Sequence, residues 1–425
     1  MKFKIISFGC KVNQYESHAV SAAMESAGFE STDENSEAQI IIINTCTVTG
    51  KSDDKSIKLV NTLRRHSPQK ILALIGCFPQ AYPQKAAELP VDIIAGSTNK
   101  ANLPFLILDY LSSKSGKTRH ITAVCDTFEE LPFNGKLKNT RGFLKIEDGC
   151  DRRCSYCIIP TARGKVRSRT LDETAKEAAR LSRLGCKEIV LVGINLSLYG
   201  SDIGLSLSDA VNTVSQVEGI SRVRLSSLEP QLMDKAFIQK LSENKKLCPH
   251  FHLSLQSGCD ETLKRMNRGY TARDYLEIVN NIRAVFENPG LTTDIMVGFS
   301  GESDDEFCHS LKFVEEVKFS KIHVFTYSPR EGTPAAEFQD KISDNVKRQR
   351  YKQMSELALK LNRKWLEKQV GTTQELIVEK TDEYIEGHTK NYTPVRIYNT
   401  KAERGSEITS KIFKAGEGYC EGEAK

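Results

Sequence analysis

Two successive series of short apolar runs, each followed by an amphipathic stretch, dominate the first three quarters of the chain. In the first series, runs typical of β-strands lie at residues 3–8, 39–43, 70–75 and 91–94, and apolar residues at helical spacing mark 14–27 and 53–65. Strands that alternate with helices form parallel sheets, because the chain must cross back over the sheet between neighbouring strands. Residues 1–112 therefore predict a parallel α/β sheet.

The second series contains six strand-like runs. They lie at 142–146, 188–192, 222–225, 252–255, 292–297 and 321–325, with helical spacing at 171–184, 260–266 and 304–317. Six such units fit a (β/α) barrel, complete or partial, in which chemistry gathers at the C-terminal ends of the strands.

The rest of the chain connects or follows these two units. Polar stretches at 112–118 and 131–140 indicate a connection, 341–370 a basic helix, and 371–425 a small β-barrel of the oligonucleotide-binding kind, with strands at 375–378, 395–398 and 407–412. A chain of 425 residues has room for two or three domains of roughly 100–200 residues each. The predicted fold class is α/β, with domains at 1–130, 140–365 and 370–425.

Composition excludes several classes of protein. No apolar run approaches the ~20 residues that would span a bilayer, and the N-terminal MKFKIISFGC lacks a signal-peptide cleavage site. We therefore expect a soluble, cytoplasmic protein that does not bind membranes. Its 12 cysteines are too sparse for a secreted disulfide scaffold, so their spacing must decide between core, catalytic and metal-binding roles.

Three cysteines, Cys150, Cys154 and Cys157, form a CxxxCxxC motif directly after the first strand of the second series. Three thiolates this close suit an iron–sulfur cluster better than zinc, which usually takes four ligands. Three ligands on a four-iron cluster leave one iron open to chelate the amino and carboxylate groups of S-adenosylmethionine (SAM). The alternative is three structural core cysteines, but core cysteines seldom cluster on a glycine-flanked, arginine-rich loop.

A second set of cysteines becomes visible only once a parallel sheet is assumed. Cys10, Cys46 and Cys77 each follow the C-terminal end of a predicted strand, which is the edge where open α/β sheets bind ligands. Any one of them alone would be a core residue, but three at equivalent places predict a second 4Fe-4S site with an open iron.

These two triads and the motifs around them resemble a known family. CxxxCxxC with Tyr156 before its last cysteine, in a (β/α) barrel, resembles the radical-SAM superfamily, and two three-cysteine sites in this order resemble its methylthiotransferases. The matching motifs extend over essentially the whole chain: FGCKVNQYES (8–17), NTCTVT (44–49), KIEDGCDRRCSYCIIPTARGKVRSR (145–169), HLSLQSG (252–258), MNRGY (266–270), TTDIMVGFSGE (292–302) and EGHTKNYTPV (386–395). The last lies in a tail similar to the family's RNA-binding TRAM domain.

The resemblance implies a tRNA-modifying methylthiotransferase, a sulfur transferase with two 4Fe-4S clusters and SAM as cofactors. An electron from the first cluster would cleave SAM to a 5′-deoxyadenosyl radical, which removes hydrogen from carbon 2 of an adenine. Sulfur held at the second cluster and a methyl group from a second SAM would complete the product. The cofactors carry the difficult step, so no protein acid or base is assigned.

The motif GCKVNQYES is similar to that of the branch acting on N6-threonylcarbamoyladenosine next to the tRNA anticodon (position 37). Two acceptors remain as alternatives: isopentenyladenosine in tRNA, whose branch reads more like GCQMN, and a ribosomal-protein aspartate, whose branch reads more like GCPKN. A non-catalytic, cluster-containing RNA-binding sensor is the alternative from another class. The expected partners are tRNA and an external electron donor such as flavodoxin or ferredoxin.

The resemblance also places SAM-contacting groups at the ends of the barrel strands. These are Tyr156, Asn195, Ser226, Glu229, Gln256 and Arg268. Between residues 141 and 169 there are eight basic and three acidic residues, an excess that indicates a polyanion nearby. The expected RNA-phosphate contacts are Arg163, Lys165, Arg167 and Arg169 beside the first cluster, and Lys390, Arg396 and Lys401 in the tail.

Overall fold

The computed structural model describes residues 1–113, 116–131 and 140–425. The N-terminal part of the chain forms a wholly parallel sheet. Its order is β2-β1-β3-β4-β5-β6, with strands β1 (Lys2–Ser7), β2 (Glu30–Ser31), β3 (Ile40–Thr45), β4 (Ile71–Gly76), β5 (Ile93–Ala95) and β6 (Thr118–His120). The helices are α1 (Lys11–Ser26), α2 (Gly50–His66), α3 (Cys77–Ala81), α4 (Pro83–Glu88) and α5 (Leu103–Ser113), with a 3₁₀ turn at Lys100–Asn102. All four predicted strands are present, and the central strand β3 is buried throughout, as expected when helices cover both faces.

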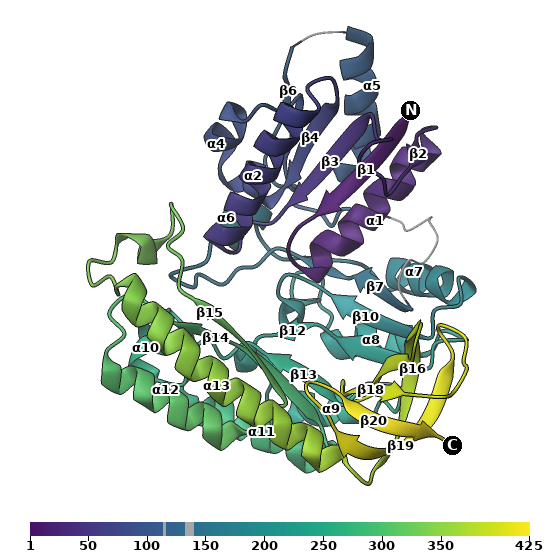
Figure 1. Ribbon diagram of the computed structural model, residues 1–425. Helices are drawn as coiled ribbons and strands as arrows, with labels where there is room; N and C mark the ends of the chain where they lie inside the picture. The colour runs from purple at the N-terminus through teal and green to yellow at the C-terminus, as the bar shows by residue number, and fades with distance from the viewer. Residues whose placement is uncertain (114–115, 132–139) are drawn as a thin grey trace.

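The middle of the chain forms a partial (β/α) barrel (Figure 1). Two parallel sheets make its wall, in the orders β11-β10-β7 and β12-β13-β14-β15. The strands are β7 (Arg141–Lys145), β10 (Glu188–Val192), β11 (Arg222–Leu225), β12 (Ser227–Leu228), β13 (His250–Leu253), β14 (Gly290–Val297) and β15 (Lys321–Thr326). Within the described ranges β7 and β15 each pair with one neighbour only, so the barrel is open between them.

Helices cover the outside of this barrel. They are α7 (Leu171–Arg183), α8 (Leu207–Ser215), α9 (Lys235–Ser242), α10 (Asp260–Arg265), α11 (Ala272–Val285) and α12 (Asp304–Val317). Smaller elements occupy the connections: α6 (Ile159–Arg163), the antiparallel pair β8 (Glu147–Asp148) and β9 (Arg167–Ser168), and 3₁₀ turns at Leu196–Leu198, Pro230–Leu232 and Pro334–Glu337. The long helix α13 (Asp344–Gln369) then packs along β15 and leads to the tail.

The tail is a closed five-stranded barrel in the order β16-β17-β18-β20-β19. Its strands are β16 (Thr373–Thr381), β17 (Ile385–Thr389), β18 (Pro394–Ile397), β19 (Glu407–Ala415) and β20 (Cys420–Ala424). The three predicted strands are present. The other two, IEGHT and CEGEA, lack the apolar run that marks a strand, because only alternate residues face the barrel core.

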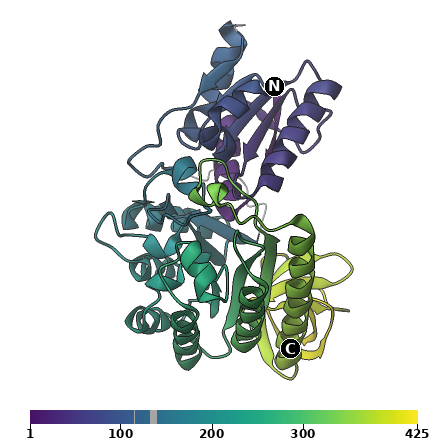
Figure 2. The same ribbon diagram turned by 90° about the vertical axis from the view of Figure 1, so that its left-hand side faces the viewer.

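The tail and the N-terminal sheet contact opposite ends of the central barrel. The tail lies at the N-terminal ends of the barrel strands, where Arg224 donates hydrogen bonds to the carbonyls of Lys390 (2.9 Å) and Thr389 (3.2 Å). The N-terminal sheet lies at the C-terminal ends, where Lys145 at the end of β7 pairs with Glu16 of α1 at 2.9 Å. Both views show the sheet above the barrel with the ends of β1 and β3 directed toward it (Figure 1, Figure 2).

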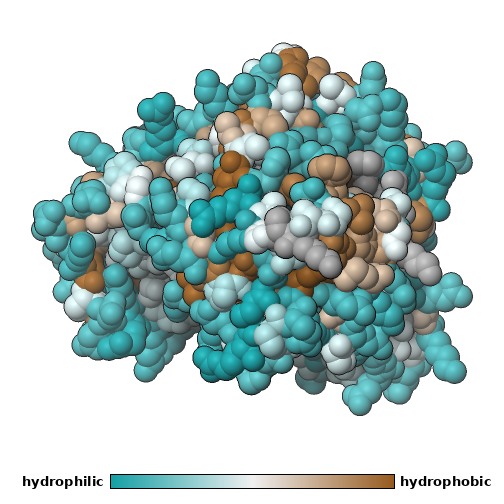
Figure 3. Space-filling model, turned by 90° about the horizontal axis from the view of Figure 1, so that it is seen from above, coloured by the Kyte–Doolittle hydropathy of each residue, from teal (hydrophilic) through white to brown (hydrophobic). Residues whose placement is uncertain are grey.

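Two further observations concern the surface and the connections. No described helix is long and apolar enough to cross a membrane. The face seen from above is mostly hydrophilic, with its hydrophobic side chains in separate patches (Figure 3). Of the two predicted connections, residues 114–115 of the first and 132–139 of the second lie outside the described residues.

Candidate active site

The first cysteine triad lies on the loop between β8 and α6, at the C-terminal end of the barrel. The loop starts at Gly149, which has φ +87°, and a Cβ there would come within 1.8 Å of the Lys165 carbonyl oxygen. The backbone N–H of Cys150 donates to the Gly164 carbonyl (2.9 Å), and the N–H of Cys157 donates to the Cys154 carbonyl (3.1 Å). All three thiols are free and partly exposed, so they are open to a ligand.

The second triad is assembled from three strand ends of the N-terminal sheet. Cys10 follows β1, Cys46 follows β3 and Cys77 follows β4, as the sequence predicted. Gly9, at φ +97°, lies so close that a Cβ would meet the Cys46 sulfur at 2.6 Å. The Asn13 side chain donates to the carbonyls of Phe8 (2.9 Å) and Thr45 (2.8 Å), and these bonds hold two of the strand ends together.

The chemistry of both triads fits iron–sulfur clusters. Burial raises the pKa of Cys46 and of Cys157 to about 12, so these thiols need a metal to be held as thiolates. In the part of the chain that the structure describes, no three His, Cys, Asp or Glu side chains are gathered tightly enough for a single metal ion. Cysteine thiolates are the protein ligands of iron–sulfur clusters, and each triad supplies three of them.

Three of the predicted SAM residues carry unused hydrogen-bonding atoms, and one of them contacts the first triad. Asn195 donates from Nδ2 to the Cys150 sulfur at 3.5 Å. Its Oδ1, the Ser226 hydroxyl and Gln256 Oε1 are buried and have no hydrogen-bond partner among the described residues. Buried polar atoms are rarely left unpaired, so this arrangement fits a polar ligand such as the amino acid and ribose of SAM.

Arg268 joins the remaining members of that predicted set. It donates to both carboxylate oxygens of Glu229 at 2.8 and 2.9 Å, to the Cys154 sulfur at 3.3 Å and to the Tyr156 hydroxyl at 3.5 Å. Burial raises the pKa of Glu229, although Arg268 opposes that rise. Of the six predicted residues, the structure therefore brings Tyr156, Glu229 and Arg268 into direct contact beside a triad cysteine.

Three of the four residues predicted to contact RNA beside the first cluster are buried in the structure. The side chains of Arg163, Arg167 and Arg169 are 1%, 4% and 2% exposed and are already paired with protein groups. A phosphate could reach them only if these buried contacts were broken. Lys165 alone points to solvent, because it lies on the outer side of the turn between α6 and β9.

Arg163 instead joins the two triads. Its Nε donates to the Cys77 sulfur at 3.1 Å, and its other nitrogens reach Asn13 Oδ1 (2.8 Å), Glu16 (2.9 Å) and Asp148 (3.2 Å). The arginine is the last residue of α6, the short helix that follows the first triad, while Cys77 belongs to the second triad. One side chain thus fixes the position of one site relative to the other.

Sequence reasoning missed the buried ion network to which Arg163 belongs. Glu16 of α1 pairs with Lys100 and with Lys145, and Lys145 also pairs with Asp148 at 2.6 Å. Burial by itself would raise the pKa of Glu16, but Arg163, Lys100 and Lys145 hold it well below its usual range. The one signal available was Glu16 within GCKVNQYES, an acidic residue on the same buried helix face as the apolar Val12 and Val20.

The predicted RNA contacts of the tail are accessible, and two of the three are paired with carboxylates. Lys390 is 42% exposed and pairs with Glu375 at 2.8 Å, whereas Arg396 is 27% exposed and pairs with Glu386 at 2.8 Å. Lys401 is exposed. These positions can reach a ligand.

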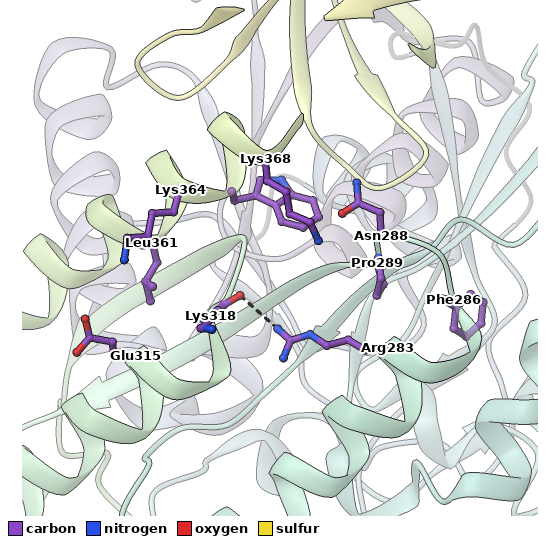
Figure 4. A pocket seen from close by; sticks show the side chains of 10 residues that line it. Arg283, Phe286, Asn288, Pro289, Glu315, Lys318, Leu361, Lys364 and Lys368 are labelled. Atoms are coloured by element: carbon purple, nitrogen blue, oxygen red, sulfur yellow. Dashed lines mark hydrogen bonds between the residues drawn. The ribbon is translucent and has the colours of Figure 1, made fainter. Parts of the chain in front are cut away.

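Two cavities lie at different distances from the cysteine triads. A cavity of about 510 Å³ lies between α11, α12 and α13 at the N-terminal end of the barrel, where Lys364 and Lys368 extend over Arg283 (Figure 4). It lies at the end of the barrel opposite the triads. Another, of about 770 Å³, lies between the start of α2, the end of β15 and the start of α13, next to the second triad.

A partial (β/α) barrel with a CxxxCxxC loop at the C-terminal ends of its strands defines a radical-SAM protein. Residues 144–314 match the model of the radical SAM superfamily, and residues 2–96 match one described as uncharacterized protein family UPF0004. A solved structure similar to this chain is the radical SAM methyltransferase TsrM from Kitasatospora setae, with a TM-score of 0.60 at 13% identity, covering 79% of this chain and 77% of that one.

Relatives at higher identity narrow the class. The threonylcarbamoyladenosine tRNA methylthiotransferase MtaB of Thermotoga maritima is 36% identical, over 88% of this chain and 86% of that protein. The protein of that name from Bacillus subtilis is 35% identical over 98% and 95%. A tRNA-2-methylthio-N(6)-dimethylallyladenosine synthase of Pelotomaculum thermopropionicum is 35% identical over 89% and 86%. The chain belongs to the radical-SAM methylthiotransferase family.

Proposed function

We propose that this protein attaches a methylthio group to carbon 2 of N6-threonylcarbamoyladenosine next to the anticodon of tRNA. The observation that carries the proposal is the pair of cysteine triads at facing strand ends, held in register by Arg163. A single radical-SAM site would not need a second triad built from three strands of another sheet. The two relatives named MtaB support the choice of acceptor.

The residues of this chain have distinct tasks in the proposed reaction. Cys150, Cys154 and Cys157 hold one 4Fe-4S cluster, and the second triad holds the other. When bound, the first cluster and SAM supply the radical that removes hydrogen from carbon 2, and the second cluster supplies the sulfur. The unpaired atoms of Asn195 and Gln256 would accept hydrogen bonds from SAM.

Access for a tRNA loop fits the open side of the barrel. The 770 Å³ cavity at that side is lined by four basic residues and one acidic residue, namely Lys51, Lys55, Lys347, Arg348 and Asp344. Phosphates would bind such a surface through charge, which positions the RNA without reading its sequence. Lys165, Lys390, Arg396 and Lys401 are proposed as additional phosphate contacts.

The division of labour between the triads is testable with reconstituted protein. Cys154→Ala should abolish reductive cleavage of SAM, whereas Cys46→Ala should leave cleavage intact and block formation of the methylthio nucleoside. Cys308→Ala is the matched control, because Cys308 is an exposed cysteine outside both triads. Equal loss of cleavage in Cys46→Ala and Cys154→Ala, with both proteins folded, would contradict the assignment.

The acceptor is tested by nucleoside mass spectrometry of total tRNA from cells with and without the gene. Loss of 2-methylthio-N6-threonylcarbamoyladenosine, with its unthiolated precursor accumulating, is the expected result. Loss of the isopentenyl counterpart would move the protein to the other acceptor, to which the 35% identical Pelotomaculum relative's name refers. If no tRNA nucleoside changed and SAM were not cleaved, the RNA-binding sensor would replace the enzyme.

Two further properties follow from the proposed reaction. The electron comes from an external donor of the flavodoxin or ferredoxin kind, since the proposed chemistry consumes an electron from outside the chain. The site of action is the cytoplasm, where tRNA is available to a modifying enzyme.

A further inference from the structure

The interior of the central barrel is polar, and Lys11, the first residue of helix α1 in the N-terminal unit, lies beside it. Lys11 directly follows Cys10 and begins α1. Its neighbour Val12 packs against Val190 and Val192 of β10, which places the start of α1 against the inner face of the barrel wall. The charged groups that act on the Lys11 ammonium are interior groups of the barrel and its lower end, namely Arg141, Glu188, Arg224, Asp294 and Tyr392.

The other cations around this interior are matched with carboxylates. Lys145 pairs with Asp148 (2.6 Å), Arg224 with Glu188 (2.6 Å), Arg268 with Glu229 (2.8 Å) and Arg141 with Glu379 (3.3 Å). These pairs account for their charges within the protein, so none of the four is free to bind an anion.

Lys11 differs from them. Among the described residues no carboxylate lies within 4.0 Å of its ammonium and none accepts a hydrogen bond from it, although the residue is half-buried. Asp294, a carboxylate that acts on it, is engaged with His252 Nε2 at 3.2 Å. A partly desolvated ammonium without a carboxylate partner is in place to bind an anionic group of a ligand.

The proposed acceptor brings such a group to this point. Threonylcarbamoyladenosine carries a carboxylate on its N6 substituent, whereas isopentenyladenosine carries an uncharged hydrocarbon there. In adenine, carbon 2 and the N6 group lie on either side of N1 on the same edge. The reacting carbon and the carbon that bears the N6 substituent are thus separated by one ring atom, and Lys11 directly follows Cys10 of the second triad.

We propose that Lys11 binds the carboxylate of the threonylcarbamoyl group and thereby selects this acceptor over uncharged N6-modified adenines. The inference rests on the proposed function. A purely structural Lys11, needed only to balance Asp294 and Glu188, would not distinguish acceptors by charge.

The test compares two anticodon stem-loops, one with the free threonyl carboxylate and one with its methyl ester. The full-length holoenzyme is prepared as wild type, Lys11→Met and Lys11→Arg, with Lys51→Met as the control, because Lys51 is an exposed lysine of the same unit. Two quantities are measured: kcat/KM for thiolation and the Kd of each stem-loop by fluorescence anisotropy. Iron and sulfide content per chain shows whether each variant retains both clusters.

The wild type is expected to prefer the free acid by about 10- to 100-fold, the worth of one hydrogen bond to a charged group. Lys11→Met should bring the acid-to-ester ratio close to one in both kcat/KM and Kd, and Lys11→Arg should restore the preference. Lys51→Met should weaken both stem-loops equally.

The possible failures are distinguishable. If the wild type thiolates neither stem-loop, the proposed function fails. If it thiolates the acid and Lys11→Met keeps the wild-type ratio, the function stands and the role of Lys11 is overturned. If Lys11→Met loses iron, the acid-to-ester Kd ratio of cluster-free wild type and variant decides the question in the same way.

Discussion

Replacing Arg163 by methionine separates the structural role of this arginine from the RNA-binding role that its sequence context predicts. The guanidinium is 1% exposed and hydrogen-bonds to Asn13, Glu16 and Asp148 as well as to the Cys77 sulfur. Removing one partner of a buried ion pair costs about 3–5 kcal/mol. Lys145 would still pair with both carboxylates, so we expect the lower end, about 3 kcal/mol.

A loss of about 3 kcal/mol in the free energy of unfolding can be measured by thermal denaturation. At about 2 °C per kcal/mol for a domain of this size, the thermal midpoint of the full-length chain should fall by about 6 °C. The second cluster should be lost more readily to a chelator, because Arg163 no longer contacts Cys77. The dependence of tRNA affinity on salt concentration should stay unchanged, since a buried arginine releases no counterion from the RNA.

Lys165→Met is the matched control, because Lys165 is exposed and follows Arg163 by two residues. It should leave the thermal midpoint unchanged and reduce the slope of log affinity against log salt by about 1, if it contacts a phosphate. The reasoning is refuted if Arg163→Met lowers the salt slope while the thermal midpoint and cluster retention stay at wild-type values.

Three other predictions test separate parts of the structure. Gly9→Ala should lower the iron content toward that of a single cluster, because the new Cβ would come within 2.6 Å of the Cys46 sulfur; iron analysis and visible absorption check it. Arg268→Met should raise the KM for SAM by about 10- to 100-fold, the worth of a charged hydrogen bond, and unchanged SAM kinetics would contradict its place among the SAM residues. Burial alone would raise the pKa of Glu188, but Arg224 lowers it below the ordinary 4.5, so its contribution to stability is present above that pH and lost on acidification. Glu188→Gln should therefore melt below wild type at pH 7, and the difference should shrink as the pH falls below 4.5 and through the lowered pKa of Glu188; a constant difference would contradict the ion pair.

The strands that the sequence predicted are those whose apolar runs are complete. The four runs of the N-terminal sheet and the six of the barrel all became strands, with ends shifted by up to two residues. The strands that were missed are short or polar: β2 has two residues, β6 reads TRH, and β17 and β20 are interrupted by glycine and glutamate. Such strands exist because a neighbouring strand offers hydrogen bonds, which no local pattern records.

The basic run after the first triad shows why charge patterns mislead. Counting charges along residues 141–169 predicts a surface for a polyanion, but the partners of Arg163 come from far away in the chain. Asn13 is 150 positions earlier and Glu16 is 147 positions earlier. A charge counted as free in the sequence is neutralised in the fold by residues that local counting cannot include.

Spacing and periodicity were sufficient for the architecture and for the positions of both cysteine triads after strand ends, because apolar runs mark where strands end. The contacts between the units depend on packing: only the folded chain brings Arg163 to Cys77, Arg268 to Cys154 and the start of α1 to the wall of the barrel. Burial then determines whether a cation is neutralised by a protein carboxylate or left for a ligand. For Lys11 that distinction comes from the surrounding barrel, since nothing in its sequence neighbours differs from those of a paired lysine.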